Sequence, residues 1–494
     1  MTALVYEGVD VKGGYGTVLR TTGRQEDDGS QSSQKWFMLT MLSVLSAINQ
    51  GICYSYAPIS SIVEDRWEQR LPSEHLITIF FISYIPCSFI GSWIMDRRGL
   101  RFGVLLGGFL QAVGAGLRYF ACSFGTLDEV YLTMAGQTLA SLAMAFMVNS
   151  PAVLSANWFP PSKRATSTSV ALNANNVGTA VVYLTAPFLV FSSDEVPAYN
   201  LYVAILAVVS WVVALVFFRS SPKPRQGFSV IPDSTAHDEY DWGQWKNAFT
   251  HSGFWHTVVA FSLAECVVNA ISALLGKFLS ATRFSNEQVG LAGAAFIISS
   301  LVGGQLISHY VDKLRNHKAA MQLCLLLTAI ALALFRLVPK VEVHATLACL
   351  LFLGVVLGPM QPIVLELGVE CAYPTSEATV AALQQLCGNF FSALVVPGLS
   401  ALQRTNVAAT EGISPSYFYT SPEWIMVFMT MVTFVVFCSF DGKHKRFHFE
   451  TTVILPHTRH QDQETTDSTA TVTKDSFRDF FFARLLSANF CFLV

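Results

Sequence analysis

WIMDRRGLRFG, residues 93–103, is a short charged stretch in an otherwise apolar part of the chain. Its charged residues Asp96, Arg97, Arg98 and Arg101 separate HLITIFFISYIPCSFIGSWIM from FGVLLGGFLQAVGAGL. Each of these apolar stretches is close to the length of about 20 residues that an α-helix needs to cross a bilayer. We interpret the charged stretch as a tight loop between two transmembrane helices.

The composition of the whole chain has the same character. Hydrophobic residues make up 52% of it and charged residues 13%, whereas an ordinary soluble domain is about 25% charged. The mean hydropathy is +0.44. We predict an all-α membrane protein, because lipid offers no hydrogen-bond partners to an open backbone. No basic patch with interleaved aromatic residues indicates nucleic-acid binding, and no Cys or His spacing indicates a metal or a cofactor.

Twelve apolar segments are long enough to span a bilayer. They are 36–61, 76–95, 102–123, 131–156, 167–190, 199–218, 253–280, 288–310, 318–338, 343–367, 376–402 and 422–440. We predict a terminal segment at 1–35, six-helix bundles at 36–218 and 253–440, a polar linker at 219–252 and a tail at 441–494. The linker ends in DWGQWKNAF, which alternates aromatic and polar residues. That pattern predicts a short helix lying in the membrane interface.

Basic residues gather in the connections on one side of the predicted bundle. On this side lie Arg97, Arg98, Arg101, Lys163, Arg164, Arg219, Lys223, Arg225, Lys246, Lys313, Arg315 and Lys318. The other side holds Arg66, Arg70, Arg283, Lys340 and Arg404. Because loops rich in Lys and Arg stay in the cytosol, we expect the richer side and both termini to be cytosolic.

The two halves of the chain repeat two landmarks at nearly the same separation. Asp96 and Arg97 follow the second span, and Asp312 and Lys313 follow the eighth. FPPS precedes the fifth span and YPTS precedes the eleventh. A parallel duplication of a six-helix unit explains both matches.

The loop pattern D-R-x-G-x-R at residues 96–101 resembles the signature of the major facilitator superfamily. The resemblance implies a fold of six plus six helices with a pseudo-two-fold repeat, and transport by alternating access. It also implies gating contacts that tie the halves together on the cytosolic side. The gating residues that we predict are Asp96, Arg97, Arg101, Asp312, Glu366 and Glu370.

Several further stretches are similar to the solute carrier 49 family, which includes the feline leukaemia virus subgroup C receptor-related proteins. They are WIMDRRGLR, GQTLASLAMAFMVNSPAVLSANWF and ELGVECAYPTSEATVAAL. WFxxxxRATxT, YxPI and GAGLR lean towards the renal carcinoma branch of that family. The resemblance implies lysosomal or vacuolar membranes and small vitamin-like solutes such as pyridoxine. A plasma-membrane location remains open.

In such an architecture the substrate lies near the bilayer midplane, between the halves. Polar residues in the middle of spans are therefore the candidates. The predicted substrate-binding residues are Asn49, Gln50, Tyr54, Tyr56, Gln137, Asn149, Asn176, Asn269, Gln361, Gln385 and Asn389. A single Asn or Gln can instead link two helices by a hydrogen bond.

Glu265 is a carboxyl group about halfway along the seventh span. A bare charge there costs several kcal/mol, so we expect it to hold a proton or to pair with a cation. We predict a proton-coupling or cation-binding role, with an interhelical hydrogen bond as the structural alternative. Lys277 lies near the outer end of the same span, and we interpret it as a side chain that reaches the membrane surface.

The leading hypothesis is a monomeric transporter of a small organic solute, embedded in lipid and possessing no enzymatic activity. Choline, ethanolamine or haem are alternative substrates within the same family. Span 1 reads INQGICYSYAPI and lacks the Trp that could face a quaternary ammonium group. A non-transporting receptor or sensor on the same scaffold is a second class. A membrane enzyme is disfavoured, because the sequence shows no catalytic cluster.

Overall fold

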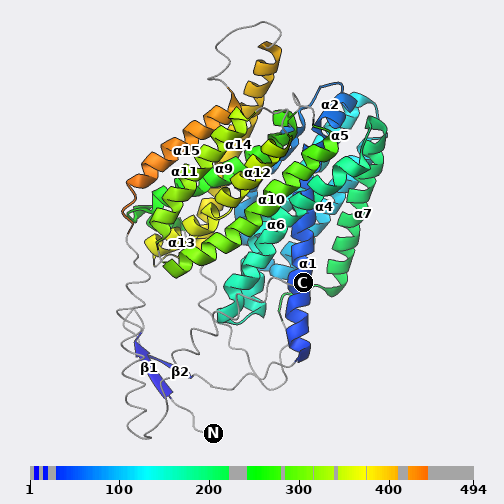
Figure 1. Cartoon of the computed structure of the whole chain (residues 1–494). Coiled ribbons are helices and arrows are strands. Elements are labelled where there is room, and N and C mark those ends of the chain that lie inside the picture. The colour runs from blue at the N-terminus through cyan, green and yellow to red at the C-terminus, as the bar shows by residue number, and fades with distance from the viewer. Residues whose placement is uncertain are drawn as a thin grey trace.

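Helices form nearly all of the described chain. The computed structural model describes residues 5–9, 15–19, 29–221, 242–279, 284–314, 316–338, 343–373, 375, 377–409 and 421–442. Most of the long helices are packed side by side along a similar direction (Figure 1). We call the end that holds α2 the upper end, and the end at which α1 begins the lower end, as they stand in Figure 1.

The described helices of the first half correspond to the first six predicted spans. Its elements are α1 (Gly29–Tyr54), η1 (Ala57–Ile59), α2 (Ser60–Arg66), α3 (Ser73–Arg98), α4 (Leu100–Ala121), α5 (Thr126–Trp158), α6 (Pro161–Leu189), η2 (Ser193–Glu195) and α7 (Val196–Phe217). The first span is broken into α1, η1 and α2. The break follows from Pro58, which has no N–H to continue the helical hydrogen bonds.

The described helices of the second half correspond to the other six predicted spans, with one short helix before them. Its elements are α8 (Trp242–Thr250), α9 (Phe254–Leu279), α10 (Asn286–Leu314), α11 (His317–Leu337), α12 (Val343–Leu357), α13 (Met360–Ala372), α14 (Glu377–Ala409) and α15 (Pro422–Cys438). The tenth span is broken between α12 and α13, at Gly358 and Pro359. The linker helix predicted at DWGQWKNAF is present as α8. Its place in the membrane interface stays a prediction.

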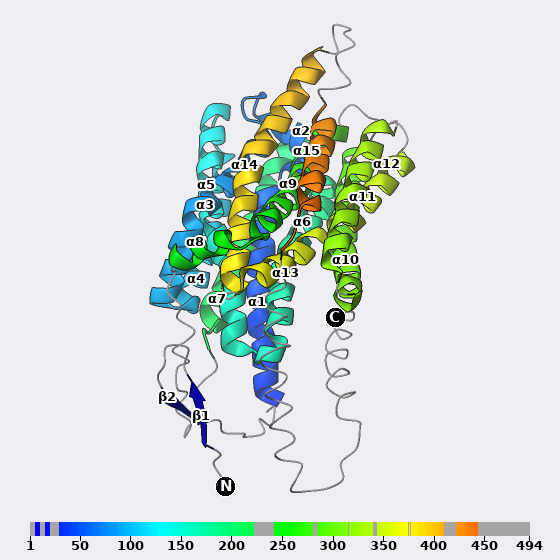
Figure 2. The same cartoon turned by 90° about the vertical axis from the view of Figure 1, so that its left-hand side faces the viewer.

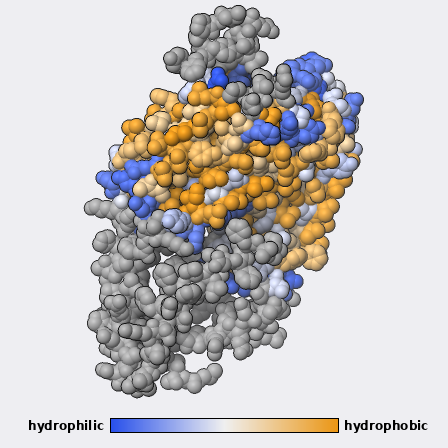
Figure 3. All heavy atoms as spheres, viewed as in Figure 1, coloured by the Kyte–Doolittle hydropathy of each residue, from blue (hydrophilic) through white to orange (hydrophobic). Residues whose placement is uncertain are grey.

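Ten stretches of the described residues are long and apolar enough to cross a membrane. The last span, α15, is apolar but has only 17 residues. The predicted fifth span, α6, is not among the ten, and Asn173, Asn175 and Asn176 make its middle part polar. Figure 3 shows apolar side chains over most of the described surface in that view, with polar residues gathered towards the two ends. An apolar surface of this extent is typical of a protein that is surrounded by lipid.

The packing pairs of the first half recur in the second. Helix α1 packs on α6 as α9 packs on α14, and α4 packs on α7 as α11 packs on α15. Between the halves, α6 packs on α10 and α3 packs on α14. In Figure 2, α3, α4 and α5 lie on one side of the bundle and α10, α11 and α12 on the other. This arrangement agrees with the predicted duplication.

One element has no counterpart in the predictions. Strands β1 (Val5–Val9) and β2 (Tyr15–Leu19) form an antiparallel pair in the terminal segment, with Val5 opposite Leu19. Both strands contain β-branched and aromatic residues, which favour extended structure.

Candidate functional site

Glu265 lies at the centre of a cluster of amide side chains from three helices. On α9 itself, Asn269 Nδ2 is 3.4 Å from Glu265 Oε1. From α14, Gln385 Nε2 donates to the same oxygen at 3.0 Å. From α13, the Gln361 side chain donates to Oε2. Both carboxylate oxygens therefore accept hydrogen bonds from N–H groups.

Two local features bring these groups together. The break before α13 puts Gln361 in the first turn of a new helix, directly after Pro359 and Met360. On α14, Gly388 leaves room for the carboxylate stem, since a Cβ there would lie 3.0 Å from Glu265 Cγ. The glycine thus lets α9 and α14 approach closely at the level of Glu265.

The cluster extends into the first half of the chain through Asn269. Tyr54, the last residue of α1, donates its hydroxyl to Asn269 Oδ1 at 2.9 Å. Asn269 Nδ2 also donates to Ser392 Oγ on α14 at 3.0 Å. The amide is held from both ends, so its orientation is fixed. A continuous series of hydrogen bonds joins α1 to Glu265.

The cluster is only partly enclosed. Tyr54 and Asn269 are buried, whereas Glu265, Gln361 and Gln385 are half-buried. No Lys, Arg or His side chain contacts Glu265 within the residues that the structure describes. Because a bare charge is costly in the middle of a transmembrane helix, we expect this carboxyl group either to hold a proton or to pair with a cation that the described residues do not supply.

Four predicted substrate-binding residues are engaged elsewhere. Asn49 Nδ2 donates to the Ala140 carbonyl at 3.0 Å. Asn149 accepts from the Tyr84 hydroxyl at 3.2 Å and donates to α3. Tyr56 donates to Asn200 at 2.8 Å, and Gln137 contacts the broken part of the first span. These contacts link helices of one half.

Three other candidates keep unused hydrogen-bonding capacity. The side chains of Gln50 and Asn176 are half-buried and make no hydrogen bond with any described residue. Asn389 donates to the carbonyl of Gln385 at 2.9 Å, and its own Oδ1 is buried without a described donor. These amides remain available to a polar ligand.

A second polar cluster, at the upper end, joins the two halves by ion pairs. Lys277 on α9 lies 3.0 Å from Glu64 of α2 and also contacts Glu74 of α3. Arg404 of α14 lies 3.2 Å from Glu74, which is completely buried. Ser400 donates to Glu74 as well.

The interpretation of Lys277 as a membrane-surface anchor is wrong, because its side chain is only 14% exposed and pairs with two carboxylates. One feature of the sequence is consistent with these ion pairs. Glu64 and Glu74 fall at the end of the first span and the start of the second, on the side of the bundle predicted to hold Lys277.

Comparison with known proteins assigns the architecture to a family. The model of the Major Facilitator Superfamily matches residues 35–397, which is well over half of the chain. The chain belongs to the major facilitator superfamily. It is therefore a member of a family of transporters rather than of enzymes.

The chain is also similar to individual transporter proteins. Solute carrier family 49 member A3 from Danio rerio is 28% identical over 430 residues, which cover 84% of this chain and 89% of the relative. Choline/ethanolamine transporter FLVCR1 from Mus musculus is 26% identical over 395 residues, which cover 73% of this chain and 69% of the relative. The crystal structure of D-xylose-proton symporter matches with a TM-score of 0.64 at 15% identity, covering 83% of this chain and 98% of the other.

These findings confirm the predicted fold class and the relation to solute carrier family 49. The narrower assignment to the renal carcinoma branch stays a prediction. The likeness to the symporter shows the fold alone, at 15% identity.

The superfamily signature loop lies at the lower end, between α3 and α4. Arg97 stacks over the Trp93 ring with its Cζ 5.0 Å from the ring centroid. Arg101 Nη2 donates to the Leu215 carbonyl near the end of α7 at 3.0 Å. Gly99 has φ 85°, a conformation that favours glycine. Arg97 and Arg101 thus contact their own half in this transporter.

The remaining predicted gating residues also lie at the lower end. Asp96 is exposed at the end of α3, and on α13 Glu366 is exposed and Glu370 half-buried. The side chain of Asp312 lies outside the described part of the structure. The gating role of all these residues stays a prediction.

Proposed function

We propose that this superfamily member moves a small organic solute across a membrane by alternating access, with the solute bound beside Glu265. The observation that carries the proposal is the half-buried carboxylate, which has amide donors but no described basic partner. Unused amides at Gln50, Asn176 and Asn389 provide further hydrogen bonds. Such a site suits a polar solute.

The ion pairs around Lys277 support the alternating-access part of the proposal. They join α2 and α3 of one half to α9 and α14 of the other, all at the upper end. We infer that this conformation is closed at the upper end. Opening that end requires the same contacts to break, so they bias the equilibrium between two conformations.

The first candidate substrate is a neutral, hydroxylated solute of the pyridoxine type, taken up together with a proton. Glu265 would carry the proton, since a neutral carboxyl is the less costly form at mid-membrane depth. Hydroxyl groups of the solute would pair with the free amides. This candidate agrees with the absence of a basic residue beside Glu265 in the described chain.

The second candidate is a small organic cation. Glu265 would then neutralise the solute directly, and the mouse relative is named a choline/ethanolamine transporter. Two observations argue against choline. The single Trp of α1 is Trp36, near its lower end, and the Tyr54 hydroxyl is hydrogen-bonded to Asn269. Quaternary ammonium groups prefer open aromatic faces.

We also propose the orientation that the positive-inside rule predicts, with the lower end in the cytosol. The location would be the lysosomal or vacuolar membrane, or the plasma membrane. Immunolabelling of cells with and without permeabilisation, using a tag before α1, tests the orientation. Labelling only after permeabilisation supports it at the plasma membrane.

The test of function is flux in proteoliposomes of purified protein. Labelled pyridoxine and choline are supplied with and without an inward proton gradient, to the wild type, to Glu265→Gln and to Asp128→Asn. Asp128 is the control, because it is an exposed carboxylate in the first turn of α5. Gradient-stimulated pyridoxine uptake that Glu265→Gln abolishes and Asp128→Asn preserves supports the first candidate.

The other outcomes are equally informative. Choline uptake that ignores the proton gradient but depends on Glu265 favours the second candidate. Flux of neither solute, from protein shown to be folded, contradicts both candidates and favours a sensor.

A further inference from the structure

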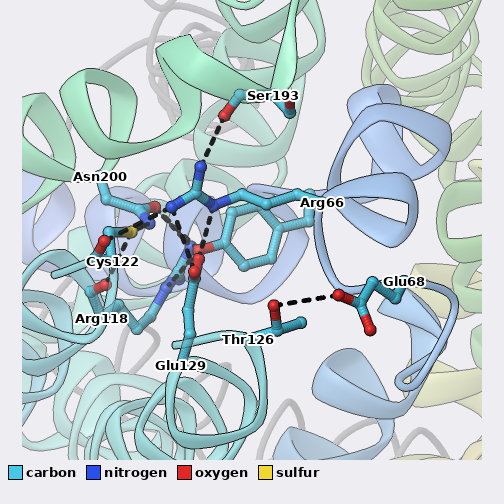
Figure 4. Close-up of polar contacts among 9 residues, drawn as sticks. Arg66, Glu68, Arg118, Cys122, Thr126, Glu129, Ser193 and Asn200 are labelled. Atoms are coloured by element: carbon cyan, nitrogen blue, oxygen red, sulfur yellow. Dashed lines mark hydrogen bonds and ion pairs between the residues drawn. The ribbon is translucent and has the colours of Figure 1, made fainter. Parts of the chain in front are cut away.

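Arg118, the last residue of GAGLR, is a buried charge that the proposed solute site does not use. It lies near the end of α4 and is 1% exposed. Its guanidinium donates to Ser55 Oγ at 2.7 Å and to Gln137 Oε1 at 3.0 Å. Figure 4 shows it beside Asn200 and Cys122. All its hydrogen-bond acceptors in the described chain are neutral.

The neighbouring carboxylate, that of Glu129, is already paired with another arginine. Glu129 accepts from Arg66 Nε at 2.7 Å and from Arg66 Nη2 at 3.1 Å (Figure 4). Arg118 makes no ion pair with any residue that the structure describes. A buried charge without a partner of opposite charge is costly, so a cation held only by neutral groups needs another source of compensation.

The compensation comes from the end of α1. This helix stops at Tyr54, and Arg118 Nη1 donates to the carbonyl of Ile52 at 3.2 Å. A helix C-terminus carries partial negative charge and unpaired carbonyls. Arg118 therefore caps the break in the first span. The guanidinium also stacks on Tyr56, with Cζ 4.2 Å from the ring centroid.

Other side chains of the first half complete the cap. Gln137 Nε2 lies 3.4 Å from the Ile52 carbonyl and 3.5 Å from that of Cys53. The Tyr199 hydroxyl donates to the Ser55 carbonyl at 3.2 Å. Carbonyls at the break in the first span thus accept hydrogen bonds from side chains of α4, α5 and α7.

The opposite side of the same segment faces the second half. Tyr54 reaches Asn269 in the Glu265 cluster. A Cβ on Gly276 would lie 3.0 Å from Ser60 Oγ, so α9 passes very close to α2. Glu64 pairs with Lys277 at the upper end. The broken span therefore contacts both the candidate solute site and the upper-end ion pairs.

We propose that Arg118 is a positioning residue that fixes the shape of this break. The fixed break allows Tyr54 to contact Asn269 and, at the same time, Glu64 to pair with Lys277. Arg118 therefore links the solute site to closure of the upper end. The inference rests on the proposed alternating-access function. A lysine cannot replace the arginine, because it lacks the planar fork that meets several acceptors at once and stacks on Tyr56.

The test measures opening of the upper end directly and needs no solute. Ser60 is buried against α9, so Ser60→Cys reacts with a membrane-impermeant maleimide only when that end opens. The rate of maleimide labelling is compared in three proteins that all carry Ser60→Cys. One has no further change, one has Arg118→Lys and one has Arg336→Lys. Arg336 is the control, because it bonds Ser421 at 3.1 Å within the second half. The parent without Ser60→Cys gives the signal of the native cysteines.

We expect Arg118→Lys to speed the labelling of folded protein about threefold to tenfold, the range that the loss of one or two hydrogen bonds produces. Arg336→Lys should leave the rate unchanged even where it lowers thermal stability. Labelling as slow as in the wild type, in folded Arg118→Lys, overturns the proposal.

A second variant covers the case in which Arg118→Lys does not fold. Tyr199→Phe removes only the hydroxyl that bonds the Ser55 carbonyl, and should raise the labelling rate by a smaller factor. No increase there overturns the proposal too. Because the labelling requires no substrate, it is independent of which solute the flux assay identifies. If no solute is transported but labelling is slow in the Ser60→Cys protein and faster with Arg118→Lys, the transport proposal is contradicted and the role of Arg118 is supported.

Discussion

Glu265 and Asn269 are one helical turn apart on α9, and that spacing is visible in the sequence. Their contact at 3.4 Å follows from it. The donors Gln361 and Gln385 also belong to the predicted set, but their meeting with Glu265 depends on how α13 and α14 pack against α9. Asn49 and Asn149 carry the same chemistry yet face other helices. Residue type identified these candidates, and only packing distinguished among them.

Gly388 provides a test of the space beside Glu265. Gly388→Ala would place a methyl group 3.0 Å from Glu265 Cγ, so we expect displacement of the carboxylate and a loss of transport of about tenfold or more. Gly398→Ala on the same helix is the control, since a Cβ there meets nothing within 4 Å. It should transport normally and gain up to about 1 kcal/mol in helix stability. Equal activity of the two variants would contradict the assigned geometry.

Tyr54 provides a test of the link between the halves at the site. Tyr54→Phe removes the hydroxyl that Asn269 accepts at 2.9 Å, at a cost of about 1 kcal/mol. We expect the KM for the solute to rise about threefold to tenfold, because Asn269 would lose its fixed orientation. Tyr119→Phe, on an exposed side chain of α4, should leave KM unchanged. Concentration-dependent uptake measures both, and an unchanged KM in Tyr54→Phe would argue against a role for Asn269 in binding.

At the scale of elements, the spans were predictable and their breaks were not. Long apolar segments reveal transmembrane helices by length and composition alone. Pro58 and Pro359 lie inside such segments, and proline is tolerated in a membrane helix when neighbours satisfy the freed carbonyls. In the first span, Arg118, Gln137 and Tyr199 bond carbonyls on either side of the break. That condition depends on helices far away in the sequence, so the sequence of the first span could not reveal it.

The upper-end ion pairs make a prediction about α2. Lys277→Gln would remove the cation that Glu64 and the buried Glu74 share and leave Glu74 with Arg404 alone, at a cost of about 2 kcal/mol to the closed conformation. We expect faster hydrogen–deuterium exchange at residues 57–66. Arg70→Gln is the control, since it breaks only the exposed pair with Glu68, and surface pairs contribute little. Identical exchange in the two variants would show that Lys277 does not hold the upper end.

At the scale of the whole molecule, two similar halves contact each other through α3, α6, α10 and α14. The repeated landmarks in the sequence predicted this duplication, and the superfamily match confirms the fold. Which end of the bundle is closed was not predictable, because closure depends on contacts between side chains of different halves. Lys277 illustrates this, since its two carboxylate partners lie more than 200 positions earlier in the chain.

The most direct measurement is transport by a molecule whose upper end is locked. Gly276 and Ser60 approach closely enough for a disulfide, because a Cβ on Gly276 would lie 3.0 Å from Ser60 Oγ. We expect the double variant Ser60→Cys and Gly276→Cys to crosslink under mild oxidation and to stop solute flux in proteoliposomes. Reductant should restore the flux, and each single variant should be insensitive to oxidation. Full flux through crosslinked protein would contradict alternating access between these two halves.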